Sequence, residues 1–397
     1  MAASARAEAA AALGRVLRSG AYSNVLLGRL GNEPDDRLIR RLVYGTLRYL
    51  VRIDRLLGQA SSRSLSDIEP FLLDLLRIGT WELRFGDAAE HAAVHEAVAA
   101  ATARSGKQAG GFVNAVLRQV QGLEESLPEG DDGRALELGV DSWIYHRLTQ
   151  AWGRDEAEAF LQESLSPAGR TARVRPGEEG GGSPVEGISG AVEIGPGSTG
   201  LVLQDPSSVA VGLAAGVGPG MTVLDMAAAP GGKTLHLYDQ MGGDGRLVAA
   251  DRHLRRVQSA QRRLRRHDAD PPWVVADGRQ LPFGASTFDR VLLDAPCTRL
   301  GTLRRRPEIR HRLQEDAPER SARLQRELLE AALAVVTPGG VVTYAVCTVF
   351  PEETVDIVGD LSASPPTGLP GRPFGKGWLL GPHLTGSDGM FVSLVRP

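Results

Sequence analysis

From about residue 200 onward, the chain alternates short apolar runs with stretches of helical periodicity. The apolar runs occupy residues 222–226, 246–250, 273–276, 290–294 and 340–346. Between the last two, the spacing of four residues from Leu324 to Leu328 and from Leu329 to Leu333 predicts a helix. Strands that alternate with helices indicate a parallel sheet that helices cover on both sides. This pattern predicts an α/β fold for residues 201–397.

The first 122 residues follow a different periodicity. Apolar residues recur at helical spacing over 38–57 and 68–85, and β-branched alternation is absent. A stretch rich in Gly, Pro and Ser at 175–190 is typical of a loop or linker. The 397 residues are enough for two or three domains. We therefore predict an all-α domain at 1–125 and a connecting region, which begins with a linker helix, at 126–200.

Composition limits the compartment and the kind of partner. The chain has no apolar run of 18 residues, so we expect no membrane helix. Its first residues lack a basic stretch followed by a Leu-rich core, so we expect no signal peptide. Only two cysteines are present, which favours a reducing, cytoplasmic location. The net charge of −3 does not indicate a nucleic-acid binder, but arginines cluster at 252–267 and 299–312.

Residues 223–234 form a turn rich in small residues between a predicted strand and a predicted helix. Small residues there let a ligand approach the backbone and the helix N-terminus. The turn is not a Walker A loop, because Ala227 stands where the first glycine of that motif belongs. The turn thus indicates a nucleotide-like ligand, and a purely structural strand–helix turn is the alternative.

Two acidic residues end the next two predicted strands. Asp251 follows the glycine-rich turn by about 20 residues, a spacing suited to a carboxylate that accepts hydrogen bonds from ribose hydroxyls. Asp277 could accept a hydrogen bond from an adenine amino group. A solvated aspartate and a loop-capping aspartate are the respective alternatives. Together the three strand ends predict a crevice for an adenosine-containing ligand.

Both cysteines, Cys297 and Cys347, lie at the ends of apolar runs, where a parallel sheet places its sites. Cys297 is three residues after Asp294. A buried cysteine is often only a small hydrophobic residue. A disulfide is disfavoured in a reducing compartment, and two cysteines without supporting histidines do not make a zinc site, so we expect no metal.

These residue types suit methylation of a pyrimidine carbon. A thiolate that adds to C6 of cytosine converts C5 into a nucleophile, provided that N3 is protonated or hydrogen-bonded. Asp294 is the acid available for that task. The sulfonium of S-adenosylmethionine could then deliver a methyl group to C5. This scheme uses one nucleophilic cysteine, one acid, a crevice for an adenosine-containing ligand and an extra base.

Longer motifs carry a resemblance to a known family. Residues 225–234 (DMAAAPGGKT), 289–301 (DRVLLDAPCTRLG), 304–310 (RRRPEIR) and 336–353 (VTPGGVVTYAVCTVFPEE) resemble the Sun/Fmu family of RNA cytosine-C5 methyltransferases. Residues 38–49 and 91–120 resemble the helical RNA-binding domain of NusB. This pairing is similar to the bacterial 16S rRNA methyltransferases of that family. The resemblance implies a Rossmann-like methyltransferase domain preceded by an all-α NusB-like domain.

The resemblance also implies roles for individual residues. Cys347 would be the nucleophile, Cys297 would assist release of the product, and Asp294 would act at the reaction centre, where it also meets the cofactor. Asp251 would bind the ribose and Asp277 the adenine side. The loop that would hold the methionine part of S-adenosylmethionine is Ala227, Ala228, Ala229, Pro230, Gly231, Gly232 and Lys233. Lys233 would also approach the target base.

Some assignments stay open at this point. DNA cytosine-C5 methyltransferases take the nucleophile from a Pro-Cys pair, which would select Cys297 instead of Cys347. We expect Arg304, Arg305 and Arg306 to contact RNA phosphates, with a solvated surface as the alternative. Residues 126–200 would hold an abbreviated RNA-recognition-like subdomain, and the protein would be a monomer. The substrate could be tRNA or another RNA, and a non-catalytic RNA-binding assembly factor is the alternative from another class.

Overall fold

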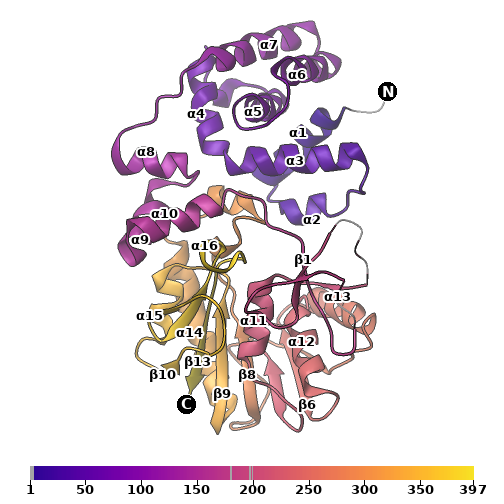
Figure 1. Cartoon of the computed structure of the whole chain (residues 1–397), viewed down its shortest axis with the longest axis vertical. Helices are drawn as coiled ribbons and strands as arrows, with labels where there is room; N and C mark the ends of the chain where they lie inside the picture. The colour runs from indigo at the N-terminus through magenta and orange to yellow at the C-terminus, as the bar shows by residue number, and fades with distance from the viewer. Residues whose placement is uncertain (1–3, 179–180, 196–197, 199) are drawn as a thin grey trace. The chain divides into compact units, whose positions relative to one another are not determined.

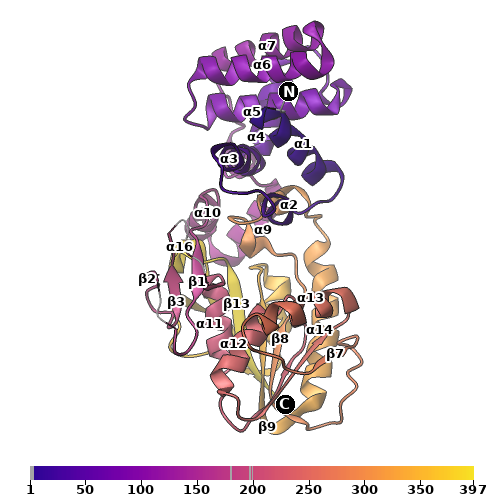
Figure 2. The ribbon, with the colours of Figure 1, turned by 90° about the vertical axis from the view of Figure 1, so that its right-hand side faces the viewer.

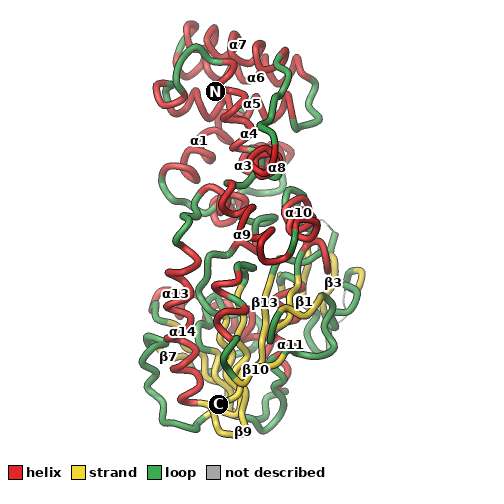
Figure 3. Tube along the Cα trace, turned by 90° about the vertical axis from the view of Figure 1, so that its left-hand side faces the viewer, coloured by secondary structure: helices red, strands yellow, loops and turns green. Residues whose placement is uncertain are grey.

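The computed structural model describes residues 4–178, 181–195, 198 and 200–397. The chain forms two compact units. The helical unit comprises Met1–Leu165 together with Leu303–Leu313, and the sheet unit comprises Ser166–Thr302 with Gln314–Pro397. Figure 3 shows that the first unit is built from helices and that the strands belong to the second.

Several helices of the helical unit pack around α5, which Figure 1 shows with other helices on several sides. Its elements are α1 (Ala5–Arg18), α2 (Ser23–Leu27), α3 (Pro34–Arg48), α4 (Leu50–Ala60), the 3-10 turn η1 (Leu65–Asp67), α5 (Pro70–Arg84), α6 (Glu90–Ser105), α7 (Lys107–Gly122), α8 (Gly130–Glu137), α9 (Ser142–Trp152), α10 (Arg154–Glu163) and η3 (Pro307–His311).

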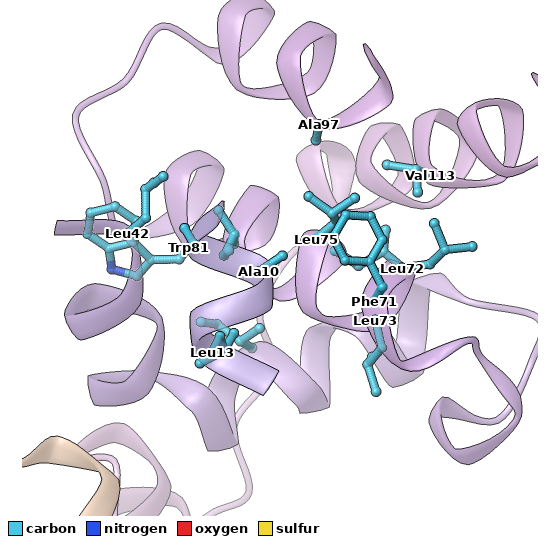
Figure 4. Close-up of a cluster of buried hydrophobic side chains, with 14 of the residues drawn as sticks. Ala10, Leu13, Leu42, Phe71, Leu72, Leu73, Leu75, Trp81, Ala97 and Val113 are labelled. Carbon is cyan, nitrogen blue, oxygen red and sulfur yellow. The ribbon is translucent and has the colours of Figure 1, made fainter. Parts of the chain in front are cut away.

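Helix α5 is central because most of its residues are buried. Pro70 begins it at a position where the missing N–H costs nothing. Apolar residues that face different neighbours, among them Phe71, Leu75 and Ile78, are all buried. Its buried acids are paired with arginines of α1, so this helix lies inside the core. Figure 4 shows side chains of α5 in one cluster with residues of α1, α3, α6 and α7.

The short segment Leu303–Leu313 is far in sequence from the rest of the helical unit, yet it is anchored there by buried polar contacts. The buried Glu308 carboxylate accepts hydrogen bonds from the Ser23 backbone N–H at 3.1 Å and the Ser23 hydroxyl at 2.7 Å. Arg310 donates to the Leu138 and Ser164 carbonyl oxygens at 3.0 and 2.9 Å. Burial lowers the pKa of Arg310 to about 9.

These contacts predict a stability effect at Glu308. Replacing Glu308 with Ala should lower the free energy of unfolding of the full chain by about 2 kcal/mol, because two hydrogen bonds to a charged acceptor disappear and Ser23 stays buried without a partner. A urea titration measures the change. Glu163→Ala, at an exposed carboxylate of the same unit, is the matched control. Equal stability of the two variants would contradict the anchoring role.

The sheet unit begins with a small antiparallel sheet of strand order β2-β3-β1-β4. Its strands are β1 (Thr171–Arg173), β2 (Ser183–Pro184), β3 (Ala191–Glu193) and β4 (Val202–Leu203). Each strand is two or three residues long, and the edge strand β4 pairs only with β1 along the described residues. This sheet falls in the region expected to hold an abbreviated subdomain.

The large sheet has the order β11-β12-β13-β9-β8-β5-β6-β7, and β10 also pairs with β13. Its strands are β5 (Thr222–Asp225), β6 (Arg246–Asp251), β7 (Trp273–Val275), β8 (Phe288–Asp294), β9 (Val336–Val346), β10 (Ser362–Ser364), β11 (Arg372–Phe374), β12 (Gly377–Leu380) and β13 (Met390–Arg396). Strands β5 to β9 are parallel, whereas β10 to β13 join antiparallel. The strand order reverses between β5 and β8.

Helices cover both faces of the large sheet. The remaining helical elements of the unit are α11 (Pro206–Ala214), α12 (Gly232–Met241), α13 (Leu254–Arg265), η2 (Leu300–Thr302), α14 (Ala317–Val335), η4 (Pro351–Glu353), α15 (Val355–Val358) and α16 (Pro382–Thr385). Adjacent strand residues point to opposite faces, so Leu292 packs with α11 and α12 while Leu293 packs with α14 and α15. Figure 2 shows α12 and α14 on opposite sides of the sheet.

The predicted fold class is confirmed: helices precede a domain with a mixed α/β sheet. The five predicted apolar runs form the parallel strands. The antiparallel strands from the C-terminal part of the chain were not predicted. The domain limits near residues 125 and 200 stay predictions. The division of the chain into compact units places a boundary after Leu165. No helix among the described residues is long and apolar enough to cross a membrane.

Candidate active site

The carboxyl ends of the parallel strands gather the sequence-predicted residues of the sheet unit. Asp251 ends β6, Asp294 ends β8, and Cys347 directly follows β9. The strand order reverses between β5 and β8, and ligands of open parallel sheets bind beside such a reversal. The loop from β5 to α12, which contains Ala227 to Lys233, begins at this point.

The tight course of that loop depends on Gly231. Gly231 has φ +93°, a left-handed conformation that favours glycine. A Cβ atom at this position would lie 2.5 Å from Leu264 Cδ1 of α13. Glycine therefore lets the loop turn directly into α12, which begins at Gly232.

One hollow beside the loop has apolar walls and acidic ends. Its lining is Met226, Ala227, Ala250, Asp251, Arg252, Arg256, Ala276, Asp277, Gly278, Pro296, Leu324 and Leu328. A Cβ atom at Gly278 would lie 2.7 Å from Leu328 Cδ2 and 3.0 Å from Met226 Cε, so a side chain there would crowd the walls. A mainly apolar lining that includes the carboxylates Asp251 and Asp277 fits a flat base joined to a ribose.

The Asp251 carboxylate in this hollow is buried and oriented by its neighbours. It accepts hydrogen bonds from the Ala229 N–H at 3.3 Å and the His253 N–H at 3.0 Å. Arg256 lies 3.3 Å from the same group. A carboxylate has about four acceptor positions, so capacity for ribose hydroxyls remains. Asp277 differs, because Arg279 binds both of its oxygens, and that contact holds the pKa of Asp277 far below its usual range.

A second hollow contains the pair Lys233 and Asp294. Its lining is Leu203, Gln204, Asp205, Ser208, Asp225, Ala227, Ala228, Ala229, Pro230, Gly232, Lys233, Arg263 and Asp294. Lys233 Nζ lies 2.7 Å from Asp294 Oδ2. Burial alone would lower the pKa of Lys233, but the negative charge of Asp294 and its hydrogen bond outweigh it, so that pKa is raised. Lys233 is therefore a cation held at the bottom of this hollow.

The two cysteines are free thiols whose sulfur atoms are 3.3 Å apart. The hydrogen bond between them lowers the pKa of Cys347, and the positive charge of Lys233 adds to that effect against the opposing burial. The same hydrogen bond and burial raise the pKa of Cys297 well above its usual value. These shifts favour Cys347 as the thiol that ionises first, and in that state Cys297 is the donor of the hydrogen bond between them.

Among the buried acids of the sheet unit that were not singled out from the sequence, two bear on the site. Asp225, at the end of β5, is 1% exposed and accepts a hydrogen bond from Thr234 Oγ1 at 2.6 Å. Burial raises its pKa to about 7. Position at a strand end, the signal that marked Asp251 and Asp294, also applied to Asp225.

The second of these acids is Glu353, which holds the loop that follows Cys297. Its carboxylate accepts hydrogen bonds from the Thr298 N–H at 3.0 Å and from Gln325 Nε2 at 2.9 Å. Gln325 also donates to the Pro296 carbonyl oxygen at 2.9 Å. Glu353 and Gln325 together fix the backbone on both sides of Cys297.

Arg304, Arg305 and Arg306 lie in the segment Leu303–Leu313 of the helical unit, whereas both cysteines belong to the sheet unit. Their side chains are half-buried, and the Arg304 carbonyl oxygen accepts a hydrogen bond from Arg48 at 3.0 Å. Their contact with RNA stays a prediction. Among the described residues, no cluster of three or more His, Cys, Asp or Glu side chains could hold a metal ion.

Two family models match the chain. Residues 217–395 match the family described as 16S rRNA methyltransferase RsmB/F, and residues 3–122 match the NusB family. The first covers the sheet unit from just before β5, and the second covers α1 to α7.

Relatives match this chain over nearly its full length, across both the helical and the sheet unit. The chain is 34% identical over 427 residues to Rv1407 of Mycobacterium tuberculosis, named as a candidate methyltransferase, covering 95% of this chain and 93% of Rv1407. It is 30% identical over 431 residues to ribosomal RNA small subunit methyltransferase B of Cronobacter sakazakii, covering 98% and 97%. The crystal structure of PH0851 is similar in fold, with a TM-score of 0.83 at 23% identity over 99% of this chain and 98% of that one.

Proposed function

The chain belongs to the RsmB/F family of S-adenosylmethionine-dependent RNA cytosine-C5 methyltransferases, and from that premise we propose that it methylates C5 of a cytosine in 16S rRNA. The 16S assignment is supported by the names of full-length relatives, such as the methyltransferase B of Cronobacter sakazakii. The observation that carries the chemistry is the thiol pair, Cys297 and Cys347, whose electrostatic surroundings include Lys233. The reaction is expected in the cytoplasm, where rRNA is made.

Cys347 is the attacking nucleophile in this proposal. Its lowered pKa gives more thiolate near neutral pH, because Cys297 donates a hydrogen bond to it and Lys233 contributes positive charge. The thiolate adds to C6 of the cytosine and breaks the π bond between C5 and C6. That electron pair is delocalised over C5 and, through C4, onto N3, which takes up a proton, so C5 becomes nucleophilic.

The Lys233–Asp294 pair donates a proton to N3 of the base and later accepts it back. The pair shares a hydrogen bond of 2.7 Å, and a proton from it neutralises N3 as the C6 adduct forms. S-adenosylmethionine, when bound, supplies an electrophilic methyl group for C5. C5 then loses its proton to water, Cys347 leaves C6 as a thiolate, and the N3 proton returns to the pair. Cys297 stabilises the departing thiolate with the hydrogen bond that it makes in the free protein.

The chain's own residues form a binding site suited to the cofactor. The hollow with apolar walls accommodates the adenine, with Asp277 at its side, and Asp251 accepts the ribose hydroxyls. Ala227 to Lys233 shape the loop for the methionine part, and Asp294 lies where the methyl group is delivered.

The substrate is tested by bisulfite sequencing of rRNA from a strain that lacks this gene. One cytosine of 16S rRNA should lose its protection from conversion, and the full chain should restore it. If a protected cytosine is lost from tRNA while 16S rRNA is unchanged, the substrate is tRNA and the proposed chemistry still holds. No lost position in any RNA would favour the assembly-factor alternative.

Cofactor binding gives a separate prediction at Asp251. In the full chain, Asp251→Ala should weaken binding of S-adenosylmethionine by about 1.5–3 kcal/mol, because the ribose loses a charged hydrogen-bond acceptor. Isothermal calorimetry measures the affinity. Asp270→Ala, at an exposed acid paired with Arg265, is the matched control. An affinity unchanged in Asp251→Ala would contradict the ribose assignment.

A further inference from the structure

A groove in the sheet unit runs between the end of α13 and the edge strand β4. Its lining is Leu201, Val202, Leu203, Ser259, Arg262, Arg263, Arg266 and His267. One wall is therefore apolar, and the other carries three guanidinium groups. Arg262 lies in the last turn of α13 and Arg266 is its C-cap, four residues later, a spacing that places residues on one side of a helix.

The three arginines of this groove are not neutralised within the protein. No ion pair or side-chain hydrogen bond joins Arg262, Arg263 or Arg266 to any residue that the structure describes. Their neighbours Arg256 and Arg265 do have acidic partners, Asp251 and Asp270. The buried Asp239 close to His267 is already bound by Arg173 and Arg175. The groove thus keeps an unbalanced positive charge.

Arg263 is the most informative of the three because it is half-buried. Burial lowers the pKa of its guanidinium, which means that the charge has lost solvation without gaining a partner. A cation in that condition gains more from an anionic ligand than a fully hydrated arginine does.

The groove is continuous with the hollow of Lys233 and Asp294. Leu203 and Arg263 line both of them, so the basic wall leads directly to that pair. A strand that places a base in the hollow would have its neighbouring phosphates along α13. Leu203, 57% exposed on the edge strand, offers an apolar contact for a sugar or a base on the opposite wall.

We propose that this groove binds the phosphodiester backbone of the RNA strand next to the target cytosine. Arg262, Arg263 and Arg266 contact successive phosphates, and Leu201 to Leu203 form the opposite wall. The proposal rests on the proposed function, since it takes RNA as the substrate. It assigns RNA contacts to α13, apart from Arg304, Arg305 and Arg306.

The test uses the full chain, an unmodified 16S rRNA transcript and salt-dependent binding. Removing a phosphate contact on a single strand lowers the slope of log K against log salt by about 0.7. Each of Arg262→Gln, Arg263→Gln and Arg266→Gln should lower the slope by about that amount, and the triple variant by roughly 2. Arg265→Gln removes the same charge from an arginine of the same helix that does not line the groove and is paired with Asp270, so it should leave the slope unchanged.

Calorimetry with S-adenosylmethionine separates the alternatives. Unchanged cofactor affinity in the triple variant, with a raised KM for RNA, supports the proposal and shows that the variant is folded. Loss of cofactor affinity in Arg263→Gln with an unaltered slope would assign that arginine to the cofactor and overturn the proposal. Equal slopes for the triple variant and Arg265→Gln would also overturn it. A wild-type chain that binds the transcript without methylating it would contradict the proposed function alone.

Discussion

Cys347→Ala should abolish methylation of the RNA while leaving the affinity for S-adenosylmethionine unchanged. The alanine has no group that can add to C6, so C5 never becomes nucleophilic, and the rate should fall by roughly 10⁴-fold or more. Transfer of a radioactive methyl group to an unmodified 16S rRNA transcript measures the loss. The cofactor hollow does not include Cys347 among its lining residues, which is why cofactor affinity should survive.

Cys347→Ser is the informative companion variant. A hydroxyl has nearly the same size but is not ionised near neutral pH, so it should be as inactive as alanine if the thiolate is the nucleophile. Substantial activity in either variant would exclude Cys347 from the attack. Retained activity in Cys347→Ala together with its loss in Cys297→Ala would assign the attack to Cys297, as in the Pro-Cys alternative.

Cys297→Ala should accumulate a covalent protein–RNA adduct that survives denaturing electrophoresis. The reason lies in the pair of sulfur atoms 3.3 Å apart. Without the hydrogen bond from Cys297, the pKa of Cys347 rises, and a thiolate of higher pKa is a poorer leaving group. Attack at C6 remains possible, but release from the methylated base becomes slow.

The same argument gives a pH dependence with a definite sign. A lowered pKa keeps Cys347 ionised to lower pH, and removing Cys297 withdraws the main cause of that lowering. The pH profile of adduct formation in Cys297→Ala should therefore lie at higher pH than the profile of methylation by the wild type. The double variant should form no adduct at any pH. An adduct trapped in Cys347→Ala instead would reverse the two roles.

The parallel half of the sheet could be predicted because each buried strand is a continuous apolar run, as at residues 290–294 within β8. The antiparallel strands could not, since β10 to β12 have three or four residues each and β10 has no apolar run. The pairing of β10 depends on β13, whose partner residues lie 30 to 34 positions later and leave no local pattern, and among the described strands β11 pairs only with the short β12.

The candidate site also contains residues that the sequence could predict and residues that it could not. Strand-end position marked Asp251, Asp294 and Cys347, because parallel topology brings carboxyl ends to one edge. Glu353 went unnoticed because an acid in a Glu-Glu pair resembles a solvated surface, and its partner Thr298 lies 55 residues earlier in the chain. The same limit applied to Arg263, whose half-burial without a partner exists only in three dimensions.

The assignment of Leu303–Leu313 to the helical unit bears on how such proteins can be recombined. The polypeptide passes from one unit to the other after Leu165, after Thr302 and after Leu313. Fusion of two independent modules needs one junction, whereas this arrangement needs three. A chimera with a single junction after Leu165 would combine Ser23 from one parent with Glu308 from the other. Substitutions in the two units should therefore be correlated among relatives. A graft between relatives should succeed only when Leu303–Leu313 comes from the same parent as the helices that bind it.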